Sequence, residues 1–139
     1  MSFEIRTDHP IIELRLFGTF TNDDLTHIAI EARRIETEEA VVRHRITDTR
    51  EITKLDIDFR GVSAFADERR ACAFPNAFKS AIVAPEVAHY GFARMFQTLN
   101  DHPRISIAIF PDEVAARDWL ALDGVALPAK AWAPSAALA

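Results

Sequence analysis

The side chains that most often perform catalysis or bind metal ions are scattered along this 139-residue chain rather than grouped. The histidines lack the helical or turn spacing of a zinc site, since they stand at positions 9, 27, 44, 89 and 102. None of Ser63, Ser80 and Ser106 lies in the glycine-flanked turn that presents a nucleophilic serine. The single Cys72, between two alanines, is typical of a small buried side chain. From the sequence we therefore expect no catalytic activity, no bound metal and no cofactor.

A different kind of chemistry, the binding of an apolar molecule, is suggested by the segment from 81 to 100. The helix predicted after Pro85 carries three aromatic residues together with a histidine and a methionine: His89, Tyr90, Phe92, Met95 and Phe96. Phe59 and Phe65 belong to the preceding helix. These side chains are candidate ligand-binding residues in an apolar cleft between the two helices. A filled core without a cavity is the alternative, because aromatic residues at helical spacing usually belong to a core. Gly91 costs this helix about 1 kcal/mol relative to Ala, which predicts a close packing neighbour.

The elements that must position these residues follow from periodicity and capping signals. Alternation predicts a hairpin over the first 16 residues, and Thr21 is the expected N-cap of a helix over 22–38. The later elements are a strand over 41–46, a turn-rich crossing to about 56, a helix over 57–72, a strand over 79–83, a helix over 85–100, a strand over 105–110 and a last helix. The order ββαβαβαβα predicts an α/β fold, with a mixed sheet of about five strands covered by about four helices.

Length and composition favour one domain over residues 1–122, followed by an Ala/Pro-rich C-terminal tail over 123–139 that packs, if at all, through Leu127 and Trp132. The net charge of −5 argues against a nucleic-acid partner. The short basic clusters are flanked by acids, as solvated faces are: Arg33-Arg34, Arg43-His44-Arg45 and Arg69-Arg70. No apolar run approaches the roughly 20 residues of a membrane span, and the N-terminus lacks a signal-peptide pattern. We therefore expect a cytoplasmic protein without an integral membrane segment.

Three stretches give the chain a resemblance to a known family. They are "IIELRLFGTFTNDDL", "HRITDTREITKLDIDF" and "IVAPEVAHYGFARMFQTLNDHPRISIAIFPDEVAARDWLAL". Together they resemble the SpoIIAA-like family of small bacterial proteins, and the resemblance covers residues 1 to about 122. It implies a fold akin to STAS domains and to the lipid-binding SEC14 domain, while function is left open.

The resemblance also implies a place to look for a phosphorylation switch. STAS anti-sigma-factor antagonists carry an Asp-Ser or Asp-Thr pair followed by Gly in the first turn of a helix. The nearest equivalent here is "LDIDFRG", in which Asp56 matches the acid and Ile57 or Asp58 stands where the hydroxyl should be. The usual phospho-acceptor is therefore absent. Asp56 or Asp58 is expected either to cap the helix or to place a fixed negative charge at its N-terminus.

Two hypotheses of function follow from the residues and the resemblance. In the first, the chain is a non-enzymatic, regulatory STAS-like module that binds an unknown protein partner or a second copy of itself. In the second, it binds a lipid or another small apolar ligand between its second and third helices, in the manner of SEC14, with peripheral membrane association. Membrane docking would also require free basic residues such as Arg60, Arg69 or Arg70 at the mouth of the cleft, rather than arginines paired with Asp67 and Glu68.

Overall fold

The computed structural model describes residues 2–122, and the predicted C-terminal tail lies outside these residues. The elements within this range are β1 (Phe3–Arg6), β2 (Ile12–Thr21), α1 (Asn22–Glu38), β3 (Arg45–Asp56), α2 (Phe59–Arg70), β4 (Phe78–Val83), α3 (Val87–Leu99), β5 (Ile105–Phe110) and α4 (Glu113–Ala121). The predicted ββαβαβαβα order is confirmed.

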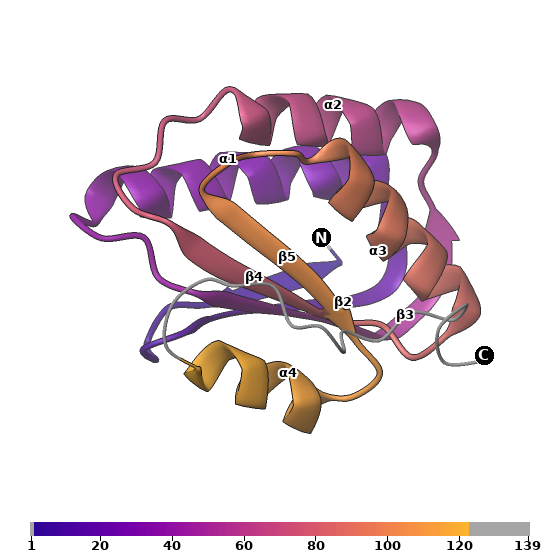
Figure 1. Cartoon of the computed structure of the whole chain (residues 1–139). Helices are drawn as coiled ribbons and strands as arrows, with labels where there is room; N and C mark the ends of the chain where they lie inside the picture. The colour runs from indigo at the N-terminus through magenta and orange to yellow at the C-terminus, as the bar shows by residue number, and fades with distance from the viewer. Residues whose placement is uncertain (1, 123–139) are drawn as a thin grey trace.

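The five strands form one mixed sheet in the order β1-β2-β3-β4-β5. β1 pairs with β2 antiparallel, while the remaining neighbours are parallel. Figure 1 shows α1, α2 and α3 on one face of the sheet and α4 alone on the other. We call the face under the three helices the inner face and the face that carries α4 the outer face. The unequal number of helices leaves part of the outer face open to solvent.

β3 is the element that differs most from its prediction. The sequence analysis ended a strand near residue 46 and placed a turn-rich crossing after it, but the strand extends from Arg45 to Asp56. Its pairing with β2 continues as far as Thr21 and Asp56, through two register shifts. Ile52 also lies in the inner core. Tertiary pairing therefore overrides the low β-propensity of this charged stretch.

The starts of the helices follow local capping chemistry. Thr21 is the N-cap of α1, as predicted, and forms a capping box in which its backbone N–H donates to Asp24 Oδ2 at 2.9 Å. α3 begins at Val87 rather than at Pro85, with Glu86 as an N-cap whose side chain makes no capping bond. The start of α3 is exposed from Pro85 to Ala88, and the first turn is closed by the helical hydrogen bond from Tyr90 N to the Glu86 carbonyl at 2.8 Å.

Two separate cores follow from this layering. The inner core joins α1 and α2 to the sheet through Leu16, Phe20, Leu25, Ile28, Ile52 and Val62. The outer core packs Trp119 and Leu120 of α4 on Val83 and Phe110 of the sheet. β4 lies between both cores, and all six of its residues are buried. Burial of every residue is typical of a parallel strand covered on both faces, and here it includes the polar Lys79 and Ser80.

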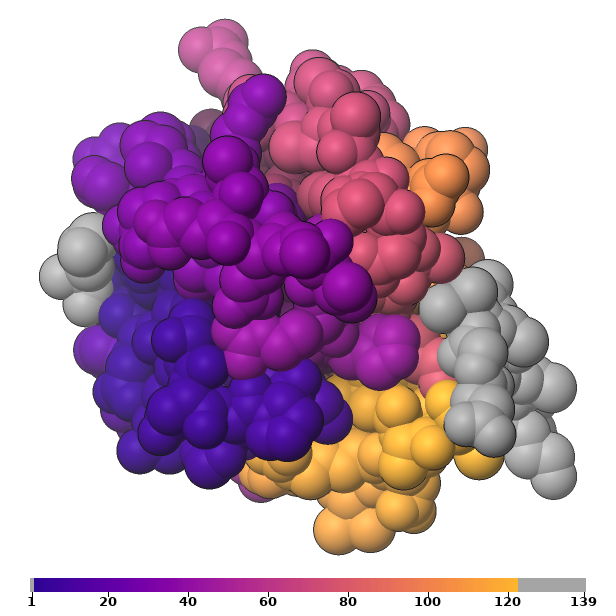
Figure 2. All heavy atoms as spheres, turned by 90° about the vertical axis from the view of Figure 1, so that its left-hand side faces the viewer, coloured from indigo at the N-terminus to yellow at the C-terminus, as the bar shows by residue number. Residues whose placement is uncertain are grey.

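Polar contacts close the ends and the edge of the sheet. The turn between β1 and β2 lies beside the connection from α1 to β3 (Figure 2), where Arg43 Nη1 donates to the Thr7 carbonyl at 2.9 Å. At the β5 edge, Gln97 Nε2 of α3 donates to the Ile107 carbonyl at 2.7 Å. A helix side chain therefore occupies a hydrogen-bonding position of the edge strand.

Candidate functional site

A small cavity lies between the inner face of the sheet and the helices α1, α2 and α3, and we call it the inner cavity. Its volume is about 60 Å³. Its wall is mostly apolar, with five polar residues, and consists of Leu14, Leu16, Phe20, Leu25, Ile28, Arg45, Thr47, Phe65, Arg69, Phe78, Ser80, Ile82, Phe92, Ala93, Phe96, Asn100 and Ile105. Such a volume is less than half of the roughly 150 Å³ of a cavity known to hold benzene.

Three of the seven candidate ligand-binding residues line the inner cavity. They are Phe65 of α2 and Phe92 and Phe96 of α3. Phe65 and Phe96 have ring centroids 5.2 Å apart, and Phe92 lies 5.9 Å from the core residue Phe20. The aromatic face of α3 is therefore both a wall of the core and a wall of a small cavity. In this arrangement the space between α2 and α3 is too small for a lipid tail.

The other four candidates lie elsewhere. The side chain of Phe59 is at the start of α2 and 61% exposed. Tyr90 packs against the core residues beneath α3, and Met95 packs against the inner core without lining the cavity. His89 is buried, and its Nδ1 has no hydrogen-bond partner among residues 2–122. A helical spacing identifies a broad apolar face, but it does not tell which residues of that face meet a void.

Gly91 has no close neighbour. A Cβ built on it would meet nothing within 4 Å, so the packing contact expected from the sequence is wrong. The glycine that does allow a close approach is Gly61, where a Cβ would lie 1.9 Å from Asn22 Oδ1. Gly61 therefore lets the start of α2 approach the start of α1.

Two polar residues of the cavity wall have an unpaired atom. Asn100 is the C-cap of α3 and is 4% exposed, and its Oδ1 has no hydrogen-bond partner within residues 2–122. Arg45 begins β3, and its Nε also has no partner among the described residues. A buried polar atom in a native protein is normally paired, either with protein or with an ordered water or ligand. Both atoms therefore mark the inner cavity as a place where a polar molecule would gain hydrogen bonds.

A buried charge cluster stands behind Arg45. Glu36 of α1 accepts hydrogen bonds from Arg45 of β3 and from Arg69 of α2, with Arg69 Nη1 2.9 Å from Glu36 Oε1. The side chains of Arg45, Glu36 and Arg69 are only 13%, 8% and 3% exposed. Burial raises the pKa of Glu36, but the Arg69 hydrogen bond and the Arg45 charge outweigh it, and the pKa lies below its ordinary value. We call these three residues the Arg–Glu–Arg cluster.

The sequence analysis did not find this cluster. It assigned the basic residues around 43–45 and 69–70 to solvated faces, which is wrong for Arg45 and Arg69. Arg69 and Glu36 are 33 positions apart, so only the packing of α2 against α1 brings them together. The one local signal is the position of Arg45 in β3. Alternate residues of a strand share a face, so Arg45 lies on the same inner face as Thr47.

The segment that the sequence analysis compared with the STAS phosphorylation loop connects β3 to α2. Asp58 is the N-cap of α2, and its Oδ1 accepts from Gly61 N at 2.8 Å and from Asn22 Nδ2 at 3.2 Å. These bonds lower the pKa of Asp58, chiefly through the Gly61 bond. Asp56 is exposed at the end of β3, and Ile57 packs against the inner core. The expectation of a capping residue is therefore confirmed for Asp58.

A shallow groove runs between α1 and α2, beside this cap. It has a volume of about 760 Å³ and is lined by Ile30, Arg33, Phe65 and Glu68 among others. Ile30 is 59% exposed, and Arg33 pairs with Glu68 across the groove. Phe65 lines both this groove and the inner cavity.

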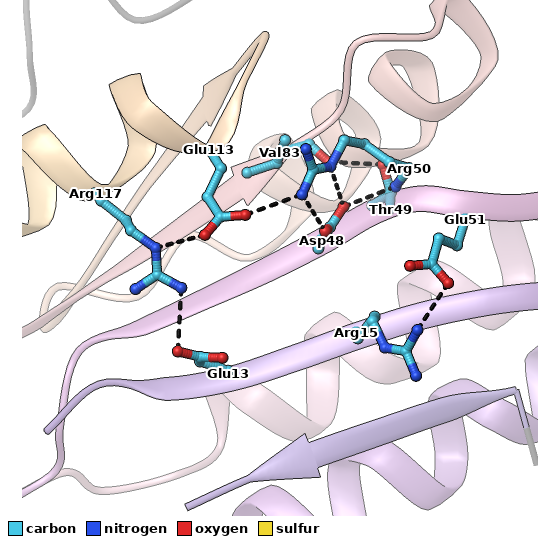
Figure 3. Close-up of polar contacts among 9 residues, drawn as sticks. All are labelled: Glu13, Arg15, Asp48, Thr49, Arg50, Glu51, Val83, Glu113 and Arg117. Carbon is cyan, nitrogen blue, oxygen red and sulfur yellow. Dashed lines mark hydrogen bonds and ion pairs between the residues drawn. The ribbon is translucent and has the colours of Figure 1, made fainter. Parts of the chain in front are cut away.

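The outer face carries a charged cleft of about 510 Å³ where α4 leaves the sheet open. Figure 3 shows its central network: Arg50 Nη2 lies 2.7 Å from Asp48 and 2.9 Å from Glu113, while Arg117 lies 2.7 Å from Glu113 and 3.1 Å from Glu13. The Asp48 bond is the main cause that raises the pKa of Arg50 above its ordinary value. All charged residues that line this cleft are in ion pairs: Glu4, Arg6, Glu13, Arg15, Asp48, Arg50, Glu51, Glu113 and Arg117. The network ties β2 and β3 to α4.

The arginines that membrane docking would require are mostly occupied. Arg69 belongs to the buried cluster, and Arg70 pairs with Asp67 and donates to the Leu99 carbonyl. No helix within residues 2–122 is long and apolar enough to cross a membrane. In the same part of the chain, no three His, Cys, Asp or Glu side chains are grouped closely enough to hold a metal ion.

Comparison with solved structures gives the fold a name. The chain is similar to the crystal structure of an uncharacterised protein of the DUF3478 family, described as having a SpoIIAA-like fold, from Shewanella loihica PV-4. The TM-score is 0.54 at 16% identity, over 85% of this chain and 91% of that chain. This chain has a SpoIIAA-like fold. The predicted resemblance is thus confirmed for the fold, and the SpoIIAA-like architecture by itself assigns no activity. Neither the protein-family models nor the curated proteins gave a match.

Proposed function

We propose that this SpoIIAA-like chain is a binding module that holds a small, partly apolar molecule in the inner cavity and performs no catalysis. The observation that supports the proposal best is Asn100, which lines a mostly apolar cavity and whose buried acceptor Oδ1 has no hydrogen-bond partner within residues 2–122. Leaving such an atom unpaired costs about 1–3 kcal/mol. A bound molecule with a hydrogen-bond donor would recover that free energy.

The walls of the cavity fit such a ligand in size and in chemistry. Phe65, Phe92 and Phe96 offer apolar surface, and Asn100 and Arg45 offer polar contacts at the same cavity. Apolar walls with a few placed polar groups are typical of small-molecule sites. The volume of about 60 Å³ restricts the ligand to a molecule smaller than benzene unless α2 and α3 move apart.

Ala93 provides the test, because it is fully buried on α3 and lines the cavity. Ala93→Val should fill part of the cavity and displace a bound molecule without unfolding the protein. Ala88→Val makes the same change at an exposed position of the same helix and is the matched control. Native mass spectrometry of freshly purified protein, followed by denaturation and extraction, would report a retained mass. We expect that mass in the wild type and in Ala88→Val, and its loss in Ala93→Val. A cavity that holds only water in all three proteins would contradict the proposal.

A second candidate function is the regulatory STAS-like module that binds a protein partner or a second copy of the chain. The α1–α2 groove favours it, because Ile30 presents an exposed apolar side chain there beside the capped start of α2. Ile30→Asp should then weaken self-association, as measured by sedimentation velocity over a range of concentrations. A monomer at all concentrations, for the wild type as well, would remove self-association from this hypothesis.

A further inference from the structure

The Arg–Glu–Arg cluster carries one more positive charge than negative charge. Arg45 and Arg69 share the single carboxylate of Glu36, and neither forms an ion pair with another acid among residues 2–122. Each guanidinium also lies near an aromatic ring, with Arg45 5.0 Å from the centroid of the Phe78 ring and Arg69 5.2 Å from that of the Phe74 ring. The ring faces attract cations but supply no full negative charge.

This excess charge is costly where it lies. The charged form of a buried group is disfavoured by desolvation and by a like charge nearby. Both act here: burial is the largest cause that lowers the pKa of Arg45, followed by the charge of Arg69, while Glu36 acts in the opposite direction. A second anion beside Arg45 would balance the cluster.

The inner cavity is the place where such an anion fits. Arg45 and Arg69 both line it, and Arg45 Nε is a buried donor without a partner. Hydrogen bonds between a guanidinium and a carboxylate are short and strong, and the buried guanidinium of Arg45 has already lost its water on folding. Asn100 lines the same cavity, and its unpaired Oδ1 can accept a hydrogen bond but cannot donate one. Among the polar residues of the cavity wall, Arg45 thus has an unpaired donor and Asn100 an unpaired acceptor.

We propose that the ligand of the inner cavity is a short hydroxycarboxylate, whose carboxylate pairs with Arg45 and whose hydroxyl donates to Asn100 Oδ1. This inference rests on the proposed binding function and names the chemical class of the ligand. The small volume requires a short chain, and the carbon atoms of that chain contact Phe92 and Phe96. The cluster then contains two cations and two anions. No covalent step is involved.

Four probes of similar size separate the elements of this proposal. Glycolate has both groups, acetate lacks the hydroxyl, glycolamide lacks the charge and acetamide lacks both. Each is titrated into the full-length protein at constant ionic strength while the Asn100 side-chain amide and the Arg45 Nε–H resonances are followed by NMR. We expect glycolate to bind at least about tenfold more tightly than glycolamide, which loses a charge-assisted hydrogen bond, and about two- to tenfold more tightly than acetate, which loses a neutral one. Sodium chloride at the same concentration should leave both resonances in place.

Substitutions assign the two contacts to their residues. Arg45→Met removes the excess charge and leaves Glu36 paired with Arg69, so the cluster becomes balanced and the fold should persist. This variant should lose the preference for glycolate over glycolamide. Asn100→Leu should lose only the preference for glycolate over acetate. Arg33→Met changes an exposed arginine that pairs with Glu68 and is the matched control for both variants.

The outcomes separate this inference from the proposed function. If glycolamide and acetamide bind as well as glycolate, the cavity binds small molecules but the anionic class is wrong. If acetate binds as well as glycolate, the hydroxyl contact is wrong. A response of the same size to chloride would show that charge alone is recognised and would overturn the carboxylate. If no probe moves either resonance and no mass is retained on purification, the proposed function fails together with the inference.

Discussion

The inner cavity and the charged cleft of the outer face use the same residue types in opposite ways. The cleft has four arginines and five carboxylates, all in ion pairs and open to solvent. The cavity wall has two buried arginines, which share the single carboxylate of Glu36 behind it, and two residues with a polar atom that has no partner among residues 2–122. Balanced, hydrated pairs hold α4 to the sheet at little gain or cost in free energy. An unbalanced buried cluster is costly, and it is therefore the better marker of a binding site.

The largest expected difference between the two regions comes from removing one carboxylate in each. Glu36→Gln leaves Arg45 and Arg69 buried together without an anion, and should lower the free energy of unfolding by about 3–5 kcal/mol. Glu113→Gln removes a carboxylate that contacts Arg50 and Arg117 on the exposed cleft, and should cost less than about 1 kcal/mol. Urea unfolding at pH 7 measures both values. Equal losses would show that burial does not distinguish the two regions.

The salt dependence of stability should also distinguish the two regions, through smaller changes in the free energy of unfolding. Arg50→Met should cost up to about 1 kcal/mol at low ionic strength. Most of this loss should vanish in 1 M sodium chloride, where the Debye length is about 3 Å. Because Glu36 is buried away from the ions of the solvent, the loss caused by Glu36→Gln should persist at both salt concentrations. A loss for Arg50→Met that is independent of salt would mean that the network in Figure 3 acts by packing rather than by charge.

The smallest predicted effect concerns the glycine of the helix that forms one wall of the cavity. Gly91 lies at an exposed position with open space around it, so Gly91→Ala should stabilise the protein by about 0.5–1 kcal/mol. Gly61→Ala should destabilise it, because the new Cβ would displace the Asn22 side chain from Asp58. Thermal unfolding of the two variants should therefore show shifts of opposite sign. A stabilising Gly61→Ala would mean that the Asn22 side chain moves freely.

The sequence predicted those parts of the fold that depend on short-range patterns. Thr21 and Asp24 mark the start of α1, and the apolar run from Ile105 to Phe110 marks a buried strand. The predicted strand ended ten residues before β3 does. In β3 the inward residues are separated by Asp, Arg and Lys on the open outer face, and these charged residues hide the strand pattern. The pairing with β2 that holds this strand is not a local property.

The candidate site could be predicted only where one helix carries it. Phe92 and Phe96 were found because their spacing is helical and both point towards the sheet. Glu36 and Arg69 were missed, since each stands among other charged residues in a helix that has a solvated face. Whether a charge in such a helix is buried depends on the neighbouring helix, and no short pattern contains that information. The most informative part of the site was therefore the least visible in the sequence.

The hydrogen bond from Gln97 to the Ile107 carbonyl has a consequence for self-assembly. β5 is the most apolar strand at an edge of the sheet, and an uncovered edge of this kind invites another strand to pair with it. A second chain that adds to β5 must first displace the Gln97 amide and leave it without its acceptor. The side chain thus acts as a gatekeeper against aggregation on the same helix that forms one wall of the inner cavity.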